Sequence, residues 1–189
     1  IEDVYIDFQV VTSSKDATTD NMEVLFVAAS KQLIDDRFKL IQKSGLEPRV
    51  IDIDALAMLN CFQIGRDSQS DSIHADIQTT ALLNIGARFT NLVVINGNSI
   101  PFTRDIMIAG NNFTTTIQKA AGVSFKEADH LKKQSNNISL AENTAIMESV
   151  FSKLVDEIRL SFDYFQSKEG GNKVDQIPVS YTHLMLPTK

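Results

Sequence analysis

Apolar and polar positions predict three regular elements in the first third of the chain. Residues 4–10 alternate as a half-buried strand does, and residues 22–28 form a short apolar run typical of a buried strand. After Ser30, which is expected to cap a helix, apolar side chains recur at helical spacing as far as Gly45. A second buried strand is predicted at residues 49–53, so that strand, helix and strand form a βαβ unit.

A polar stretch then separates the chain into two parts. A helix with apolar residues on one side is predicted from Asp54 to about Phe62. Residues 65–80 are rich in Ser, Asp and Gln and are the best candidate for a boundary between two lobes. His74 lies isolated in this segment, so we expect a solvated side chain and not a ligand.

The second part begins as a β-meander and continues with helices. Strands are predicted at residues 81–86, 90–95 and 100–108, and an Asn-Gly-Asn turn follows the second of them. The predicted helices are one capped by Asn111 or Asn112 that ends before Gly122, one with a Ser124–Glu127 capping box that ends near Lys133, and a long amphipathic one through residues 146–165.

Composition excludes several classes of protein. The 189 residues are 43% hydrophobic and 22% charged, which is ordinary for one globular domain or two small lobes. A net charge of −6 argues against nucleic acid as the main partner, and no apolar run is long enough to span a bilayer. The single cysteine, Cys61, favours a reducing compartment and is expected to be a small buried core residue.

The segment from Asn84 to Asn91 is the most informative for chemistry. Gly86 lies in the turn between two predicted strands, where backbone N–H groups can approach an anion without a Cβ in the way. The Thr90 hydroxyl could add a donor. Gly110 leads into a helix N-terminus, which is a second natural anion contact. Taken alone, either feature is better explained by an ordinary turn or helix cap.

Taken together, these residues resemble a known family. Asn84, Gly86 and Thr90 match the pattern D-x-G-x-x-x-T of the second phosphate loop of actin-like ATPases. Three further runs, at residues 23–29, 45–53 and 103–106, resemble the PilM family of type IV pilus assembly proteins, which is related to the division protein FtsA. The likeness extends over roughly residues 1–177.

The resemblance implies a partial α/β fold of the actin-like ATPase (ribonuclease H-like) type. The implied segments are the rear of subdomain 1C (1–50), the return helix of subdomain 1A (51–64), a linker (65–79), domain 2 as subdomain 2A with a helical 2B-like insertion (80–177), and a tail (178–189). The tail, with His183, resembles translated adapter sequence and is expected to be non-native. A start at Ile1 suggests that an upstream part is missing.

Carried over residue by residue, the resemblance implies a nucleotide site. Gly86 and Ala87 would lie under the phosphates, with Thr90 on the same loop. Gly110 would approach the ribose, and Lys132 would lie on the adenosine side. The alternative for Lys132 is a solvated lysine on a helix face.

Asn84 departs from the family pattern, because a neutral amide stands where the acidic residue is usual. An amide cannot supply the negative charge or act as a base, so ATP with Mg²⁺ is expected to bind to the full-length protein with little hydrolysis. No catalytic residue is assigned. The first phosphate loop and the adenosine loop are absent from these 189 residues, which are therefore expected to have negligible ATP affinity alone.

The resemblance also implies partners and a location. A PilM-like protein would hold the N-terminal tail of PilN at the cytoplasmic face of the inner membrane, with the PilO/PilP complex reached indirectly and the pilus motor ATPases as further candidates. Membrane association would be indirect. Two alternatives remain open, which are an FtsA-like division protein that tethers filaments and an actin-fold ATPase or kinase.

Other chemistry-bearing residues give weaker signals. The pairs Asp35–Asp36 and Asp156–Glu157 lie on predicted polar helix faces and are expected to be solvated. His130 has no cysteine or carboxylate at metal-ligand spacing, so no metal site is predicted.

Overall fold

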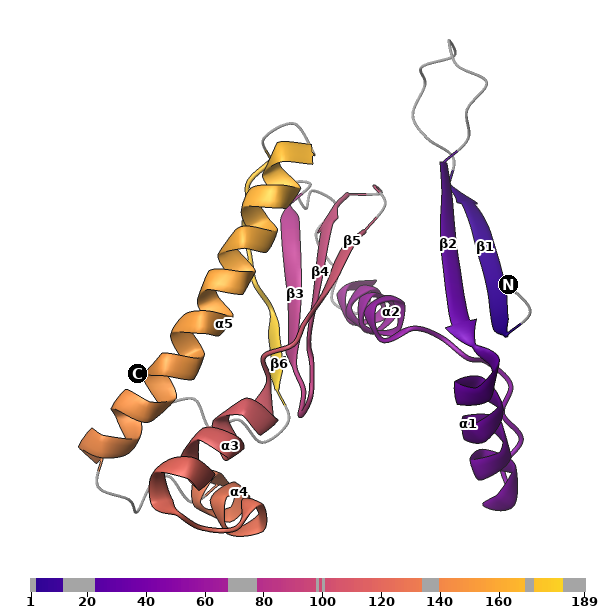
Figure 1. Cartoon of the computed structure of the whole chain (residues 1–189). Coiled ribbons are helices and arrows are strands. Elements are labelled where there is room, and N and C mark those ends of the chain that lie inside the picture. The colour runs from indigo at the N-terminus through magenta and orange to yellow at the C-terminus, as the bar shows by residue number, and fades with distance from the viewer. Residues whose placement is uncertain are drawn as a thin grey trace. The chain divides into compact units, whose positions relative to one another are not determined.

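The computed structural model describes residues 3–11, 23–67, 78–97, 99, 101–133, 140–168 and 172–181. The predicted loop at residues 13–21, His74 and His183 lie outside these ranges. The chain divides into two compact units, Ile1–Ile53 and Asp54–Lys189 (Figure 1). The helix after Ile53 therefore belongs to the second unit, while the division into subdomains 1C, 1A and 2A stays a prediction.

The first unit is a β-hairpin followed by a helix. Strands β1 (Val4–Val11) and β2 (Glu23–Ser30) pair antiparallel, and α1 (Lys31–Lys43) follows directly. The Tyr5 hydroxyl donates a hydrogen bond to Asp35 Oδ1 at 3.0 Å and so ties β1 to α1. Both predicted strands are present, but the predicted burial of the second is wrong, since Phe26 is 59% exposed. The predicted helix end at Gly45 is confirmed, and Gly45 has a φ of +83°.

Two details of this unit differ from the prediction. Residues 49–53 form no strand, and Val50 is 83% exposed, because an extended segment needs a partner strand and none of the described residues pairs with it. The unit is therefore a hairpin and helix and not a βαβ unit. Ser30 precedes α1 as predicted, but its side chain makes no capping hydrogen bond.

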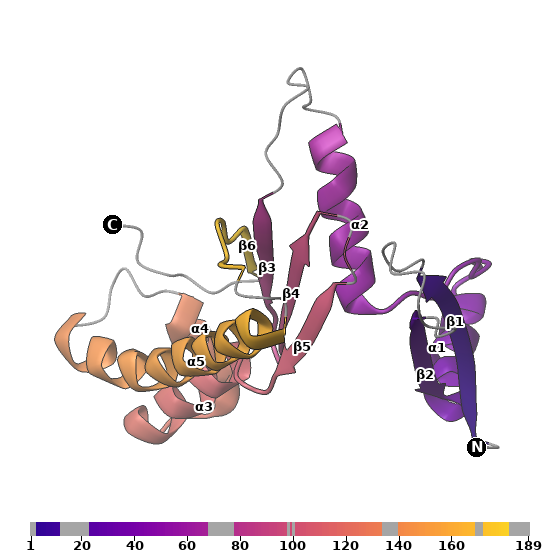
Figure 2. The same cartoon turned by 90° about the horizontal axis from the view of Figure 1, so that it is seen from above.

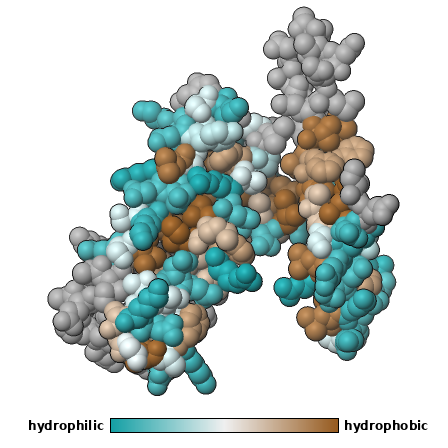
Figure 3. Space-filling model, viewed as in Figure 1, coloured by the Kyte–Doolittle hydropathy of each residue, from teal (hydrophilic) through white to brown (hydrophobic). Residues whose placement is uncertain are grey.

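One face of the hairpin is apolar, and its side chains are largely exposed. Because side chains alternate between the faces of a strand, the side chains of even-numbered residues lie opposite the face that carries Tyr5 and α1. Figure 3 shows brown, hydrophobic atoms in the region of the hairpin. Its large side chains are 41% to 64% exposed and are Ile6, Phe8, Val10, Val24 and Phe26.

The second unit is built on a four-stranded sheet in the order β5-β4-β3-β6. Antiparallel pairs join β3 (Thr79–Ile85) to β4 (Thr90–Asn96) and β4 to β5 (Phe102–Ile106), which confirms the predicted meander. On the other side of β3, β6 (Val179–Tyr181) pairs in parallel. The start of the tail predicted to be non-native thus extends the sheet, and its origin stays a prediction.

Both faces of this sheet are covered, which explains why β3 and β4 read as nearly continuous apolar runs. Helices α3 (Gly110–Ala121) and α5 (Leu140–Lys168) pack on one face, where Phe113, Leu154 and Phe165 enter the main core. Helix α2 (Asp54–Asp67) packs on the other face through Leu59. Figure 2 shows the two sets of helices on opposite sides of the sheet.

The helix ends confirm some caps and correct others. The Ser124–Glu127 capping box at the start of α4 (Phe125–Lys133) is present, with Ser124 N–H donating to Glu127 Oε2 at 2.9 Å. Gly122 ends α3 with a φ of +66°. Neither asparagine is the N-cap of α3, because Ala109 holds that position and Asn112 Oδ1 accepts the Ala109 N–H at 2.8 Å.

Cys61 is exposed, so its predicted burial is wrong. Residues two positions apart on a helix point to different sides, and α2 turns the side of Leu59 and Phe62 towards the sheet. In the ranges that the structure describes, every helix is too short or too polar to span a lipid bilayer.

A polar clamp fastens the sheet edge to α5. Arg104 of β5 donates to Glu157 Oε2 at 2.6 Å and to Ser161 Oγ at 2.8 Å. The predicted solvation of Glu157 is therefore wrong, since this carboxylate is half-buried in an ion pair. Ser161 is fully buried, and its hydroxyl in turn donates to the Glu157 carbonyl oxygen at 2.7 Å.

We predict that Arg104→Met lowers the free energy of unfolding by about 1 to 2 kcal/mol, because it removes charge-assisted hydrogen bonds in a partly buried site. Urea denaturation followed by circular dichroism measures this change. The matched control is Arg49→Met, whose ion pair with Glu47 is more than two-thirds exposed on both sides and should contribute about 0.5 kcal/mol or less. Equal effects of the two substitutions would contradict the clamp.

Candidate functional site

The turn between β3 and β4 is closed by a short contact that requires glycine. Gly86 N–H donates to the Phe89 carbonyl oxygen at 3.0 Å. A Cβ on Gly86 would lie 2.9 Å from the same oxygen, which is closer than real Cβ atoms approach. Its φ is not positive, so the close approach and not the backbone conformation selects glycine at this position.

The same turn is fastened to the first turn of α3. Gly110 N–H donates to the Gly86 carbonyl oxygen at 3.0 Å, and Asn111 N–H donates to the Ala87 carbonyl oxygen at 2.7 Å. A Cβ on Gly110 would lie only 3.2 Å from the Gly86 oxygen. The expected anion contact at this helix N-terminus is therefore not formed by these two N–H groups, because both are already satisfied by the hairpin.

Two other donors remain at the tip of the hairpin. Ala87 and Arg88 are exposed, and within the described part of the chain neither backbone N–H donates to a protein acceptor. The Arg88 guanidinium lies 5.4 Å from the centroid of the Phe89 ring. Adjacent free N–H groups in a turn form an arrangement that suits a phosphate group.

Thr90 has a structural partner in place of the expected ligand. It is fully buried, and its hydroxyl donates to the Ile108 carbonyl oxygen at 2.7 Å. This bond joins the start of β4 to the segment between β5 and α3. Thr90 therefore holds the framework of the turn, and its hydroxyl is not presented as a further donor.

Lys132 is not solvated, so that alternative is wrong. It is 7% exposed, and its ammonium group donates to Thr114 Oγ1 at 2.7 Å and to the Gly110 carbonyl oxygen at 3.3 Å. It also forms an ion pair with Asp129 at 2.9 Å. These contacts fasten α4 to the first turn of α3, and the adenosine contact of Lys132 stays a prediction.

Asp129 carries the largest pKa shift in this region. Hydrogen bonds from Lys133 and then Lys132 hold the pKa of its carboxyl at about 2, below the ordinary 3.8. The carboxylate is 32% exposed, so water screens part of this attraction.

Asn84 begins a hydrogen-bonded row that the sequence motifs did not reveal. Asn84 Nδ2 donates to Asn91 Oδ1 at 3.2 Å, and Asn91 Nδ2 donates to Asp105 Oδ1 at 2.8 Å. The three residues are consecutive partners across β3, β4 and β5. Each lies in a predicted strand of the meander, but only the pairing register brings them together. A carboxylate therefore acts on Asn84 through one intervening amide.

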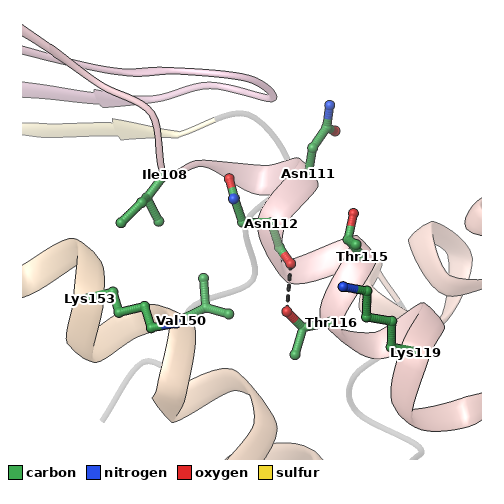
Figure 4. A pocket seen from close by; sticks show the side chains of 8 residues that line it. All are labelled: Ile108, Asn111, Asn112, Thr115, Thr116, Lys119, Val150 and Lys153. Atoms are coloured by element: carbon green, nitrogen blue, oxygen red, sulfur yellow. Dashed lines mark hydrogen bonds between the residues drawn. The ribbon is translucent and has the colours of Figure 1, made fainter.

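A hollow of about 300 Å³ lies beside this site, between α3 and α5 (Figure 4). It does not include Gly86, Ala87 or Thr90. Figure 4 shows α5 side chains on one side and α3 side chains on the other. The residues that line it are Ile108, Asn111, Asn112, Thr115, Thr116, Lys119, Val150 and Lys153.

The donors and acceptors suit a nucleotide phosphate better than a metal bound by the protein alone. Among the described residues, no three His, Cys, Asp or Glu side chains gather as a metal cluster, and His130 is exposed. The hairpin tip offers N–H donors for phosphate oxygens, and Asn84 Oδ1 is an oxygen that can accept a hydrogen bond from water bound to Mg²⁺.

Comparisons with known proteins agree with the resemblance seen in the sequence. The family described as type IV pilus assembly protein PilM matches residues 1–186. The cell division protein FtsA of Bacillus subtilis (strain 168) is 24% identical over 135 residues, which cover 67% of this chain and 29% of FtsA.

One solved structure shows the same fold over nearly the whole chain. The PilM-PilN type IV pilus biogenesis complex matches with a TM-score of 0.71 and 20% identity, over 98% of this chain and 60% of that chain. MreB 5 of Spiroplasma citri bound to AMPPNP has a TM-score of 0.49 and 18% identity, over 79% of this chain and 60% of that one. The predicted mixed α/β actin-like fold is confirmed, and the chain spans less than two thirds of these relatives.

Gly86→Ala should lower the free energy of unfolding by about 1 to 3 kcal/mol, because the added Cβ forces the turn away from the Phe89 carbonyl. The matched control is Gly65→Ala in α2, where a Cβ would meet nothing within 4 Å. There the change should raise stability by about 0.5 to 1 kcal/mol, through helix propensity. Chemical denaturation of both variants measures the difference, and a stabilising Gly86→Ala would refute the contact argument.

The lowered pKa of Asp129 should make the free energy of unfolding depend on pH in the acid range. The unfolded carboxyl protonates near 3.8 and the folded one near 2, so the unfolded state binds more protons as pH falls between these values. The ionised Asp129 carboxylate therefore adds to the free energy of unfolding above about pH 4, and this contribution is lost as the pH falls towards about 2. After solvent screening the contribution is about 1 kcal/mol. Urea unfolding at several pH values should show this loss in the wild type and not in Asp129→Asn. Asp156→Asn, on the exposed side of α5, is the control and should leave the loss unchanged.

Proposed function

Because this chain belongs to the family of type IV pilus assembly proteins PilM, as its sequence predicted, we propose that the full-length protein is a nucleotide-binding scaffold of the type IV pilus inner-membrane platform. It holds the N-terminal tail of PilN and thereby supports pilus assembly and twitching motility. It reaches PilO and PilP indirectly through PilN, and the pilus motor ATPases are candidate further contacts.

One observation carries this proposal. The likeness to the PilM-PilN complex extends over 98% of this chain, so both compact units have counterparts in a protein solved with PilN. The proposed location is the cytoplasmic face of the inner membrane, where the protein is peripheral. Its link to the membrane is indirect, through PilN.

The hairpin tip supports the nucleotide part of the proposal. The free N–H groups of Ala87 and Arg88 would bind phosphate oxygens, and the Arg88 guanidinium would add positive charge. Asn84 would accept from the water around Mg²⁺, which neutralises phosphate charge when it is bound with ATP. Since the Asn84 amide is neutral and cannot act as a base, the site suits binding better than efficient hydrolysis.

An FtsA-like division role is the second candidate. It is favoured by the 24% identity to FtsA, and it would imply filaments tethered to the membrane. The match of the PilM family to residues 1–186 favours the pilus role instead. An actin-fold ATPase or kinase is the third candidate, and the neutral Asn84 counts against it.

A fluorescent peptide copying the PilN N-terminal tail should bind saturably to the full-length protein. Fluorescence anisotropy with and without ATP and Mg²⁺ measures the affinity and its dependence on nucleotide. A scrambled peptide of the same composition is the control and should not bind. Absence of binding in every condition would refute the scaffold proposal, and filament formation or phosphate release would then favour one of the other candidates.

A further inference from the structure

Three polar side chains form a row across the end of the sheet at which the β3–β4 hairpin closes. Asn84, Asn91 and Asp105 are consecutive cross-strand partners in β3, β4 and β5. They alternate along their strands with Ile85, Leu92 and Ile106 of the main core, so they share the opposite face of the sheet. This is the face against which α2 packs.

The row has a fixed direction because its outer end is a carboxylate. An ionised carboxylate only accepts hydrogen bonds, so Asn91 turns its NH₂ group towards Asp105, at 2.8 Å. The Asn91 oxygen then faces Asn84 and accepts the Asn84 NH₂ group at 3.2 Å. Asn91 is 8% exposed, which limits its access to water as an alternative partner.

The consequence appears at Asn84. Because its NH₂ group is engaged by Asn91, its oxygen is the atom left to accept a hydrogen bond beside the hairpin tip. Water bound to a divalent cation is a strong hydrogen-bond donor. Such a water next to position 84 would therefore need an acceptor there, which the Asn84 oxygen can supply. A reversed amide would present NH₂ hydrogens instead and would oppose the cation.

We propose that Asp105 is a positioning residue that, through Asn91, holds the Asn84 amide with its oxygen towards the hydrated Mg²⁺ of a bound nucleotide. This inference rests on the proposed nucleotide binding at the hairpin tip. An aspartate at position 84 would need no such device, since both of its oxygens are acceptors. An asparagine side chain has one acceptor oxygen and one donor NH₂ group, so the orientation of the amide decides whether it can accept a hydrogen bond from metal-bound water.

The test uses the full-length protein and compares ATP binding in Mg²⁺ with ATP binding in EDTA by calorimetry. Asp105→Ala removes the acceptor and frees both amides to reverse. It should weaken MgATP binding by about three- to tenfold, while binding in EDTA changes by less than about twofold. Asp163→Ala removes an exposed carboxylate from α5 and is the control for lost charge.

A second pair of variants separates orientation from structure. In the Asn84→Asp background, position 84 accepts in either orientation, so adding Asp105→Ala should change MgATP affinity by less than about twofold. Asp105→Asn can still offer an oxygen to Asn91, but it no longer enforces the orientation of the Asn91 amide. The MgATP affinity of this variant should therefore lie between those of the wild type and Asp105→Ala. The side-chain amide resonances of Asn91 in nitrogen-15 spectra should shift in Asp105→Ala without nucleotide.

Four results would overturn the inference. An equal loss of affinity in Mg²⁺ and in EDTA would indicate a merely structural role for Asp105. A loss that persists in the Asn84→Asp background would show that Asp105 does not act through the amide. Unchanged MgATP binding by Asp105→Ala would refute the inference alone, whereas a wild-type protein that binds no nucleotide would refute the proposed nucleotide binding and the inference together.

Discussion

The first turn of α3 is fastened to the tip of the β3–β4 hairpin by two backbone hydrogen bonds, and much of the second unit depends on this contact. A helix N-terminus has N–H groups without partners inside the helix, and here the Gly86 and Ala87 carbonyl oxygens satisfy two of them. The approach leaves little room for a side chain at position 110, where a Cβ would lie 3.2 Å from the Gly86 carbonyl oxygen. Lys132 reinforces it from α4 through the Gly110 carbonyl. The contact fixes the hairpin, α3 and α4 against one another, so the exposed N–H groups at the tip stand on a rigid support.

Much of this fold could be predicted from the sequence because its signals are local. The strands of the meander, the hairpin turn and the Ser124–Glu127 box all depend on neighbouring residues, and the structure confirms them. The predicted strand at residues 49–53 failed because a strand requires a partner elsewhere in the chain. Cys61 failed for a related reason, since helical periodicity shows that a helix has an apolar side but not how far that side extends.

The candidate site shows the same division between local and distant information. The glycines at positions 86 and 110 were identified from sequence, and at each of them an added Cβ would come close to a backbone oxygen. Thr90 and Lys132 were identified too, yet their polar groups are directed at Ile108 and at the first turn of α3. A motif can single out a residue, but whether its polar group faces a ligand or the framework depends on partners far away in the sequence.

Residues 103–106, which carried part of the resemblance, now have physical roles on both faces of the sheet. Arg104 points to the α5 side and joins Glu157, while Asp105 points to the opposite side and ends the row that begins at Asn84. Alternation along a single strand therefore lets two neighbouring residues serve the core and the site separately. The amide at position 84 is neutral, but its hydrogen bond to Asn91 leaves its oxygen as an acceptor beside the hairpin tip. In the function proposed above, that acceptor would serve the binding and release of a nucleotide and not its efficient hydrolysis.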